Sequence, residues 1–148
     1  MKPEKWIAWQ PLKKMTGTYY IKSCVNNDFC TLTIILGQYE QKNIELYISF
    51  DSVEKYEVTN ETYKLKTWQY LSDTHQNLNR QHPLFIIEHS NFLNRISEES
   101  EGISDSRHLK HYCIMDSEWS IDIATVTEPI VEIMVDSKII ESSSQKYV

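Results

Sequence analysis

Glycine is scarce in this sequence, with three residues among 148, and there are only four prolines. A phosphate-binding loop needs several glycines within a few positions, because its backbone must approach the phosphates closely. Glycine-rich nucleotide-binding loops are therefore excluded. No Gly/Pro-rich linker divides the chain, so we expect a single domain over residues 1–148. The polar end, at about residues 142–148, is expected to be a frayed tail.

Long hydrophobic runs are also missing. No segment approaches the roughly 20 apolar residues that a membrane-spanning helix needs. The N-terminal stretch MKPEKWIAWQPLKK has charges and a proline too close to its apolar residues to form a signal-peptide core. The three cysteines, Cys24, Cys30 and Cys113, are an odd set without a CxxC pair, which is typical of free thiols in a reducing compartment. These absences predict a cytoplasmic protein without membrane contact.

Positive charge is depleted in the last third of the chain. Residues 1–22 carry five lysines against Glu4, whereas residues 97–136 carry ten acids against Arg107 and Lys110, a net charge of −8. The second region repels a phosphate backbone, which argues against nucleic acid as a direct ligand. A basic protein surface is the partner that such a region attracts.

Period-two alternation of apolar and polar residues is the dominant pattern, and it predicts β-strands. The run IELYISF shows it most clearly. The turn-forming NND at 26–28 is expected to join the first two strands into a hairpin. The predicted strands cover residues 18–25, 29–36, 44–50, 53–58, 83–89, 109–115, 119–126 and 130–135.

Two segments have a helical rhythm instead. Residues 60–73 repeat apolar residues in steps of three after a capping Asn60, although their tyrosines and threonines leave a strand as the alternative. Residues 90–100 begin with a capping Ser90 and stop at Gly102. The predicted fold is α+β, an antiparallel-rich sheet of about six to seven strands with one or two helices packed on one face.

The segment HLKHYCIMDSEW, residues 108–119, gathers residues able to do chemistry. His108 and His111 fall on opposite faces of a strand, which disfavours a shared metal. His111 and Cys113 share a face, but their side chains run parallel, which is poor geometry for proton transfer. We therefore expect no catalytic residue, no metal and no cofactor. A small-molecule or metal site near His111, Cys113 and Tyr47 is the alternative.

The acidic residues of the last third are the strongest indication of function. Glu98, Glu99 and Glu101 fall at the C-terminal end of the predicted helix, where the helix dipole already places partial negative charge. A cationic partner would supply the missing compensation. Exposed aromatics beside acids are typical of protein-binding hot spots. The predicted contact set, expected to form one outward patch, is Glu98, Glu99, Glu101, Asp105, Asp116, Glu118 and Trp119.

A general pattern spanning roughly residues 17–135 resembles a group of small bacterial single-domain α+β proteins of the toxin-immunity type. Three segments carry it: ISFDSVEKYEVTNE, FIIEHSNFLNRISEESEGI and LKHYCIMDSEWSIDIATVTEP. The resemblance implies an acidic cytoplasmic protein that binds a bacterial toxin, and it implies no active-site residues.

The sequence therefore predicts a non-enzymatic, cytoplasmic protein-binding module, such as an immunity protein that neutralises a basic toxin domain through an acidic surface. The first alternative is the small-molecule or metal-binding protein described above. The second is a homodimeric protein of structural role that pairs through a strand edge, so the oligomeric state, monomer or homodimer, stays open.

Overall fold

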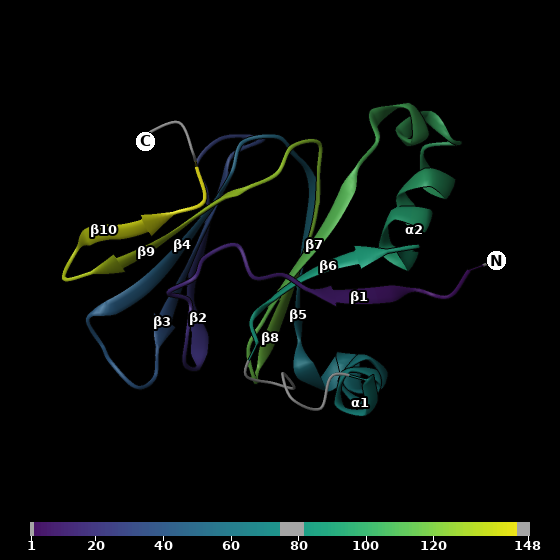
Figure 1. The fold of residues 1–148 in the computed structure, drawn as a ribbon. Coiled ribbons are helices and arrows are strands. Elements are labelled where there is room, and N and C mark those ends of the chain that lie inside the picture. Colours follow the sequence, from purple (N-terminus) through teal and green to yellow (C-terminus); the bar gives the residue numbers. More distant parts are fainter. Residues whose placement is uncertain (1, 75–81, 145–148) are drawn as a thin grey trace.

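Two five-stranded antiparallel sheets form the body of the protein in a computed structural model that describes residues 2–74 and 82–144 (Figure 1). Sheet A has the strand order β1 (Lys5–Ala8), β6 (Leu84–Glu88), β7 (Lys110–Met115), β8 (Trp119–Thr125) and β5 (Val53–Asn60). Sheet B has the order β10 (Lys138–Ser142), β9 (Ile130–Val135), β4 (Ile44–Phe50), β3 (Leu32–Gln38) and β2 (Tyr19–Asn26).

The main core lies between the two sheets. The alternation in β3 and β4 directs every second side chain inward, and Ile34, Leu36, Leu46 and Ile48 are completely buried. Sheet A contributes Ile123 and other residues of β7 and β8 from the opposite side. The period-two alternation of β3 and β4 therefore predicts which of their side chains lie between the sheets, because alternation places one face of each strand against the core.

The α+β class is confirmed, but the expected single sheet of six to seven strands is two sheets. Only Asp51 and Ser52 separate β4 from β5, yet β4 pairs with β3 and β9 in sheet B, whereas β5 pairs with β8 in sheet A. Alternation shows which side chains of a strand are buried, not which strand it pairs with. Two short strands, β1 and β10, add to the eight that the sequence predicts.

Helices cover the outer face of sheet A, the face turned away from sheet B (Figure 1). The segment after Asn60 forms the 3₁₀ helix η1 (Glu61–Lys64) and helix α1 (Leu65–Thr74), so the predicted helix is confirmed there and the strand alternative is wrong. Trp68 and Leu71 of α1 pack on β6 and β7.

Helix α2 (Asn91–Glu99) leads into the 3₁₀ helix η3 (Ile103–Arg107). Both predicted caps are made: Asn60 accepts from the N–H of Thr62, and Ser90 accepts from the N–H of Leu93.

The C-terminal end is attached further along than the sequence suggests. Strand β10 includes Ser142, and the backbone of Ser143 donates to Val131 of β9 while its hydroxyl accepts from the same residue. Residues 145–148 of the predicted tail, and residues 75–81 of the polar stretch between α1 and β6, lie outside the described residues. Among the described helices, none has the length and hydropathy that a bilayer crossing requires.

Candidate functional site

Four of the seven predicted contact residues come together where α2 turns into η3. Glu98 and Glu99 end α2, Glu101 follows in a left-handed conformation, and Asp105 lies in η3; all four are exposed. The Ser97 hydroxyl donates to the Asp105 carboxylate at 2.7 Å, which ties the two helical segments together. We call these four residues the acidic end of α2.

A groove of about 230 Å³ runs between α2 and η3, beside this acidic end. Asp105 forms part of its wall, and Leu93 and Leu109 supply apolar surface. The remaining lining residues are Asn94, Ser97, Ser104 and His108. The groove therefore combines apolar surface with a carboxylate, which suits a long side chain that ends in a cation.

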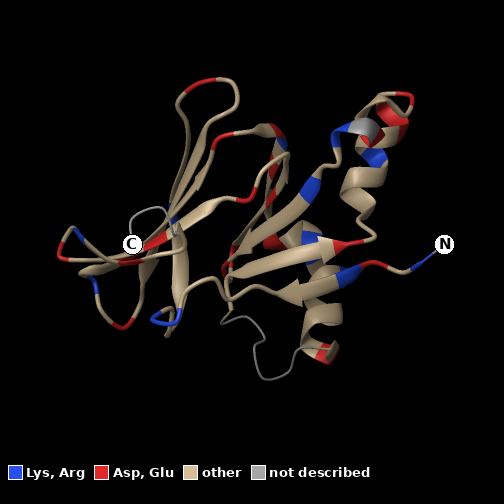
Figure 2. Ribbon diagram, turned by 45° about the horizontal axis from the view of Figure 1, so that its top comes forward, with Lys and Arg blue, Asp and Glu red and all other residues tan. Residues whose placement is uncertain are grey.

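The arginines closest in sequence to the acidic end pair with other partners. Arg107 forms an ion pair with Glu54, and an Arg95 nitrogen lies 3.7 Å from the Glu57 carboxylate; both acids belong to β5. Within the described part of the chain, Glu98, Glu99 and Glu101 form no ion pair. Figure 2 shows both acidic and basic positions along α2 and the segment that follows it.

Asp116 is buried and belongs to the fold rather than to the surface. The residue is 5% exposed, and Oδ1 accepts the backbone N–H groups of Glu118 and Trp119 at 2.8 and 2.7 Å. Oδ2 accepts the N–H of Ile21 at 2.8 Å, which links the β7–β8 turn of sheet A to β2 of sheet B. The sequence contained a signal for this role, because an aspartate at the start of a turn commonly accepts from N–H groups two and three residues on.

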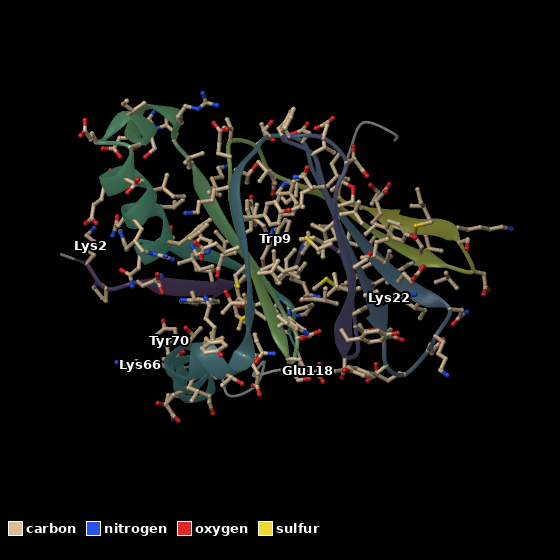
Figure 3. The ribbon with its side chains drawn as sticks, turned by 180° about the vertical axis from the view of Figure 1, so that it is seen from behind. Lys2, Trp9, Lys22, Lys66, Tyr70 and Glu118 are labelled. Atoms are coloured by element: carbon tan, nitrogen blue, oxygen red, sulfur yellow. The ribbon has the colours of Figure 1, made fainter. Side chains whose placement is uncertain are left out.

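The structure does not bring Glu118 and Trp119 to the acidic end of α2. Both are exposed: Glu118 is in the turn after β7 and Trp119 begins β8, whereas η3 precedes β7. Six strand residues separate the two groups, a span of about 17 Å. In Figure 3, Glu118 lies at the bottom of the view and α2 at the upper left. The expected single patch is thus two separate groups at opposite ends of sheet A.

A chain of hydrogen bonds lies beneath the helices on the outer face of sheet A. Asp122 is at its centre: Oδ1 lies 2.7 Å from His111 Nε2, and Oδ2 lies 2.8 Å from Lys64 Nζ. At the other side of the imidazole, Nδ1 lies 2.7 Å from Ser90 Oγ. An ionised carboxylate only accepts, so His111 donates from Nε2; a neutral imidazole then accepts from the Ser90 hydroxyl at Nδ1. Ser90 Oγ in turn accepts from the N–H of Leu93, which connects the chain to the start of α2.

The electrostatics of this chain follow from burial and from the fixed donors. Burial alone raises the pKa of Asp122, but the hydrogen bond from His111 and the ammonium of Lys64 outweigh it and hold the pKa at about 2. Burial lowers the pKa of Lys64, but the Asp122 carboxylate reverses this and the pKa is raised. Burial and the Asp122 carboxylate raise the pKa of the Cys113 thiol. Both members of the Asp122–Lys64 pair are therefore charged at neutral pH.

A cleft of about 170 Å³ opens above the chain, between η1–α1 and α2. Its floor includes Trp6 of β1, His111 of β7 and Asp122 of β8. Lys64 and Thr67 border it on the η1–α1 side, and Glu4, Asn91, Phe92 and Arg95 complete the lining. An adjoining cleft of about 250 Å³ shares Glu4, Trp6, Thr67 and Asn91 and extends to Lys66 and Tyr70, both labelled beside α1 in Figure 3.

The Ser90–His111–Asp122 order is that of a hydrolytic triad, but Ser90 is poorly placed as a nucleophile. The residue is 4% exposed and does not line the cleft, and its side-chain oxygen caps α2. Cys113 shares the outer face with His111, as the sequence predicts, but it is completely buried. The hydrogen bonds thus hold the side chains of the cleft floor in place. Neither Ser90 nor Cys113 is exposed as a nucleophile.

The alternative site expected near His111, Cys113 and Tyr47 does not form as one unit. Tyr47 is in β4 of sheet B, on the face opposite the core residues Leu46 and Ile48, whereas His111 is on the helix-covered face of sheet A. Among residues 2–74 and 82–144, no group of three or more His, Cys, Asp or Glu side chains is arranged to hold a metal ion.

Lys64 and Asp122 were not singled out in the sequence, although Asp122 had a signal. In WSIDIATV, Ile121 and Ile123 face the core, so Asp122 lies on the opposite face. Because the predicted helices must cover one face of the sheet, a carboxylate there needs a buried cation or donor. No periodicity indicates that Lys64, 58 positions earlier, would supply it.

Comparison with protein families, with curated proteins and with solved structures finds no match for the chain. The resemblance to toxin-immunity proteins therefore stays a prediction.

Proposed function

We propose that this protein is a non-enzymatic binding module that recognises a protein partner with a basic surface at the acidic end of α2. The observation that carries the proposal is the groove between α2 and η3, which has Asp105 in its wall and three further exposed carboxylates next to it. Glu118 and Trp119, in the other group, are left out of the contact surface.

The chemistry of the groove suits a lysine or arginine side chain from the partner. Its aliphatic stem would pack on Leu93 and Leu109, and its cationic head would bond to the Asp105 carboxylate. Glu98, Glu99 and Glu101 surround this position and would accelerate association by long-range attraction. The negative end of the α2 dipole adds to the same field.

A basic toxin domain is a partner of this kind. Toxin nucleases need a cationic surface to hold phosphates, and an acidic module seated there blocks access to the substrate. In this proposal the protein acts in the cytoplasm as an immunity protein, and binding alone neutralises the toxin. Its own residues perform no chemical step.

Affinity purification from the native cell tests the proposal with matched charge reversals. The bait proteins are the wild type, the double variant Glu98→Lys/Glu99→Lys, and Glu118→Lys at the far end of sheet A. We expect one basic protein to be retained by the wild type and by Glu118→Lys, and to be lost from the double variant. Salt should weaken its retention, because surface charges are screened. Equal retention by the double variant would show that the acidic end of α2 is not the contact surface.

A further inference from the structure

The cleft between η1–α1 and α2 shares no lining residue with the groove beside the acidic end of α2. The chain as a whole has a net charge of −6. The lining of the cleft and its extension has the opposite balance: three cations, Lys64, Lys66 and Arg95, against two carboxylates, Glu4 and Asp122. A cationic recess in an acidic protein favours an anionic ligand.

Both carboxylates of the cleft already hold donors from the protein. Glu4 accepts from the Trp6 indole at 3.0 Å through Oε1 and from the backbone N–H of Asn91 at 2.8 Å through Oε2. Asp122 accepts from His111 and Lys64. These oxygens are therefore poorly available to a ligand cation, which would have to displace the donors.

The cations retain donors that a ligand can use. The Lys64 ammonium has three N–H groups, and one of them is directed at Asp122. The Arg95 side chain is 63% exposed, and its contact with Glu57, at 3.7 Å, is longer than a hydrogen bond. Lys64 comes from η1 and Arg95 from α2, so the two cations approach the cleft from different elements.

We propose that this cleft binds a small aromatic anion whose carboxylate or phosphate lies between Lys64 and Arg95. The ring would lie toward Trp6 and Tyr70, which contribute apolar surface to the cleft and its extension. The cleft, about 170 Å³, and its extension, about 250 Å³, are each smaller than the roughly 300 Å³ of the smallest pockets for drug-sized ligands. A single ring with one anionic group matches this space. The ligand's oxygens bond to the lysine and the guanidinium, which favour charged acceptors.

Titration with three probes of one shape tests this site: benzoate, phenyl phosphate and the cation benzamidinium. Binding is followed by amide chemical shifts in the labelled full chain. We expect saturable shifts at Asn91, Phe92 and His111 with benzoate, phenyl phosphate or both, and none with benzamidinium. Preference for one anion identifies the ligand as a carboxylate or as a phosphate. Saturable binding of benzamidinium at these residues, or of neither anion, overturns the proposal.

Matched arginine variants separate the site from general charge effects. Arg95→Gln removes the cleft guanidinium from an exposed position, whereas Arg107→Gln removes an equal charge from η3, outside the cleft lining. We expect Arg95→Gln to weaken anion binding about tenfold, as the loss of one charge-assisted hydrogen bond does, and Arg107→Gln to change it less than twofold. Equal effects of the two variants would show that the cleft does not hold the anion.

Discussion

His111 Nε2 donates to Asp122 Oδ1 at 2.7 Å, and the two side chains are only 3% and 4% exposed. The two residues lie on neighbouring strands, where Cys113 is directly opposite Asp122 and His111 is directly opposite Ala124. The pair is therefore diagonal on the helix-covered face. It connects the floor of the cleft to Lys64 on one side and to the α2 cap, Ser90, on the other.

Asp122→Asn should destabilise the protein at neutral pH and make its stability less sensitive to acid. The folded pKa of Asp122, about 2, is below the ordinary 3.8. The ionised Asp122 carboxylate therefore stabilises the folded protein above about pH 4, and this contribution is lost as the pH falls toward 2. It amounts to roughly 2 kcal/mol. Urea unfolding at pH 7 and at pH 2 measures it: the wild type and the variant should differ at pH 7 and converge at pH 2. A constant difference would contradict the prediction, and Glu118→Gln, in an exposed turn, is the control.

Asp116→Ala should weaken the fold without affecting partner binding. It removes the acceptor for three backbone N–H groups, those of Ile21, Glu118 and Trp119. We expect a loss of about 2 to 4 kcal/mol in the free energy of unfolding. Asp116→Asn, which retains one acceptor oxygen, should lose less. If the Asp116→Ala protein is as stable as the wild type but no longer retains the basic partner, Asp116 belongs to the contact surface and the prediction is wrong.

Ser90 should not react with a fluorophosphonate probe, because its hydroxyl is buried and bonded to His111 and Leu93. Mass spectrometry of the intact chain should show no added probe mass, with a serine hydrolase as the positive control. Labelling that disappears in Ser90→Ala would identify a reactive nucleophile and would contradict the non-enzymatic proposal. Ser90→Ala should also destabilise the fold by about 1 kcal/mol, through loss of the α2 cap.

Local patterns account for the elements that the sequence identified correctly. Strand alternation in β3 and β4, and the caps Asn60 and Ser90, depend on neighbours within a few residues, so they are readable without tertiary structure. The same holds for the placement of His111 and Cys113 on one face. By contrast, β1 is four residues long and β10 five, too short for a clear periodic signal.

The sequence by itself determined the α+β class, most strands and both helices, because these follow from periodicity and from residues that cap or break elements. Tertiary structure decided which strands joined which sheet, since pairing depends on partners far apart in the chain. It also decided the roles of the carboxylates: Asp116 is buried in a turn, Asp122 is paired with Lys64, and the acidic end of α2 stays in solvent. Formal charge is a property of each residue alone, but burial and pairing arise only when distant segments pack together.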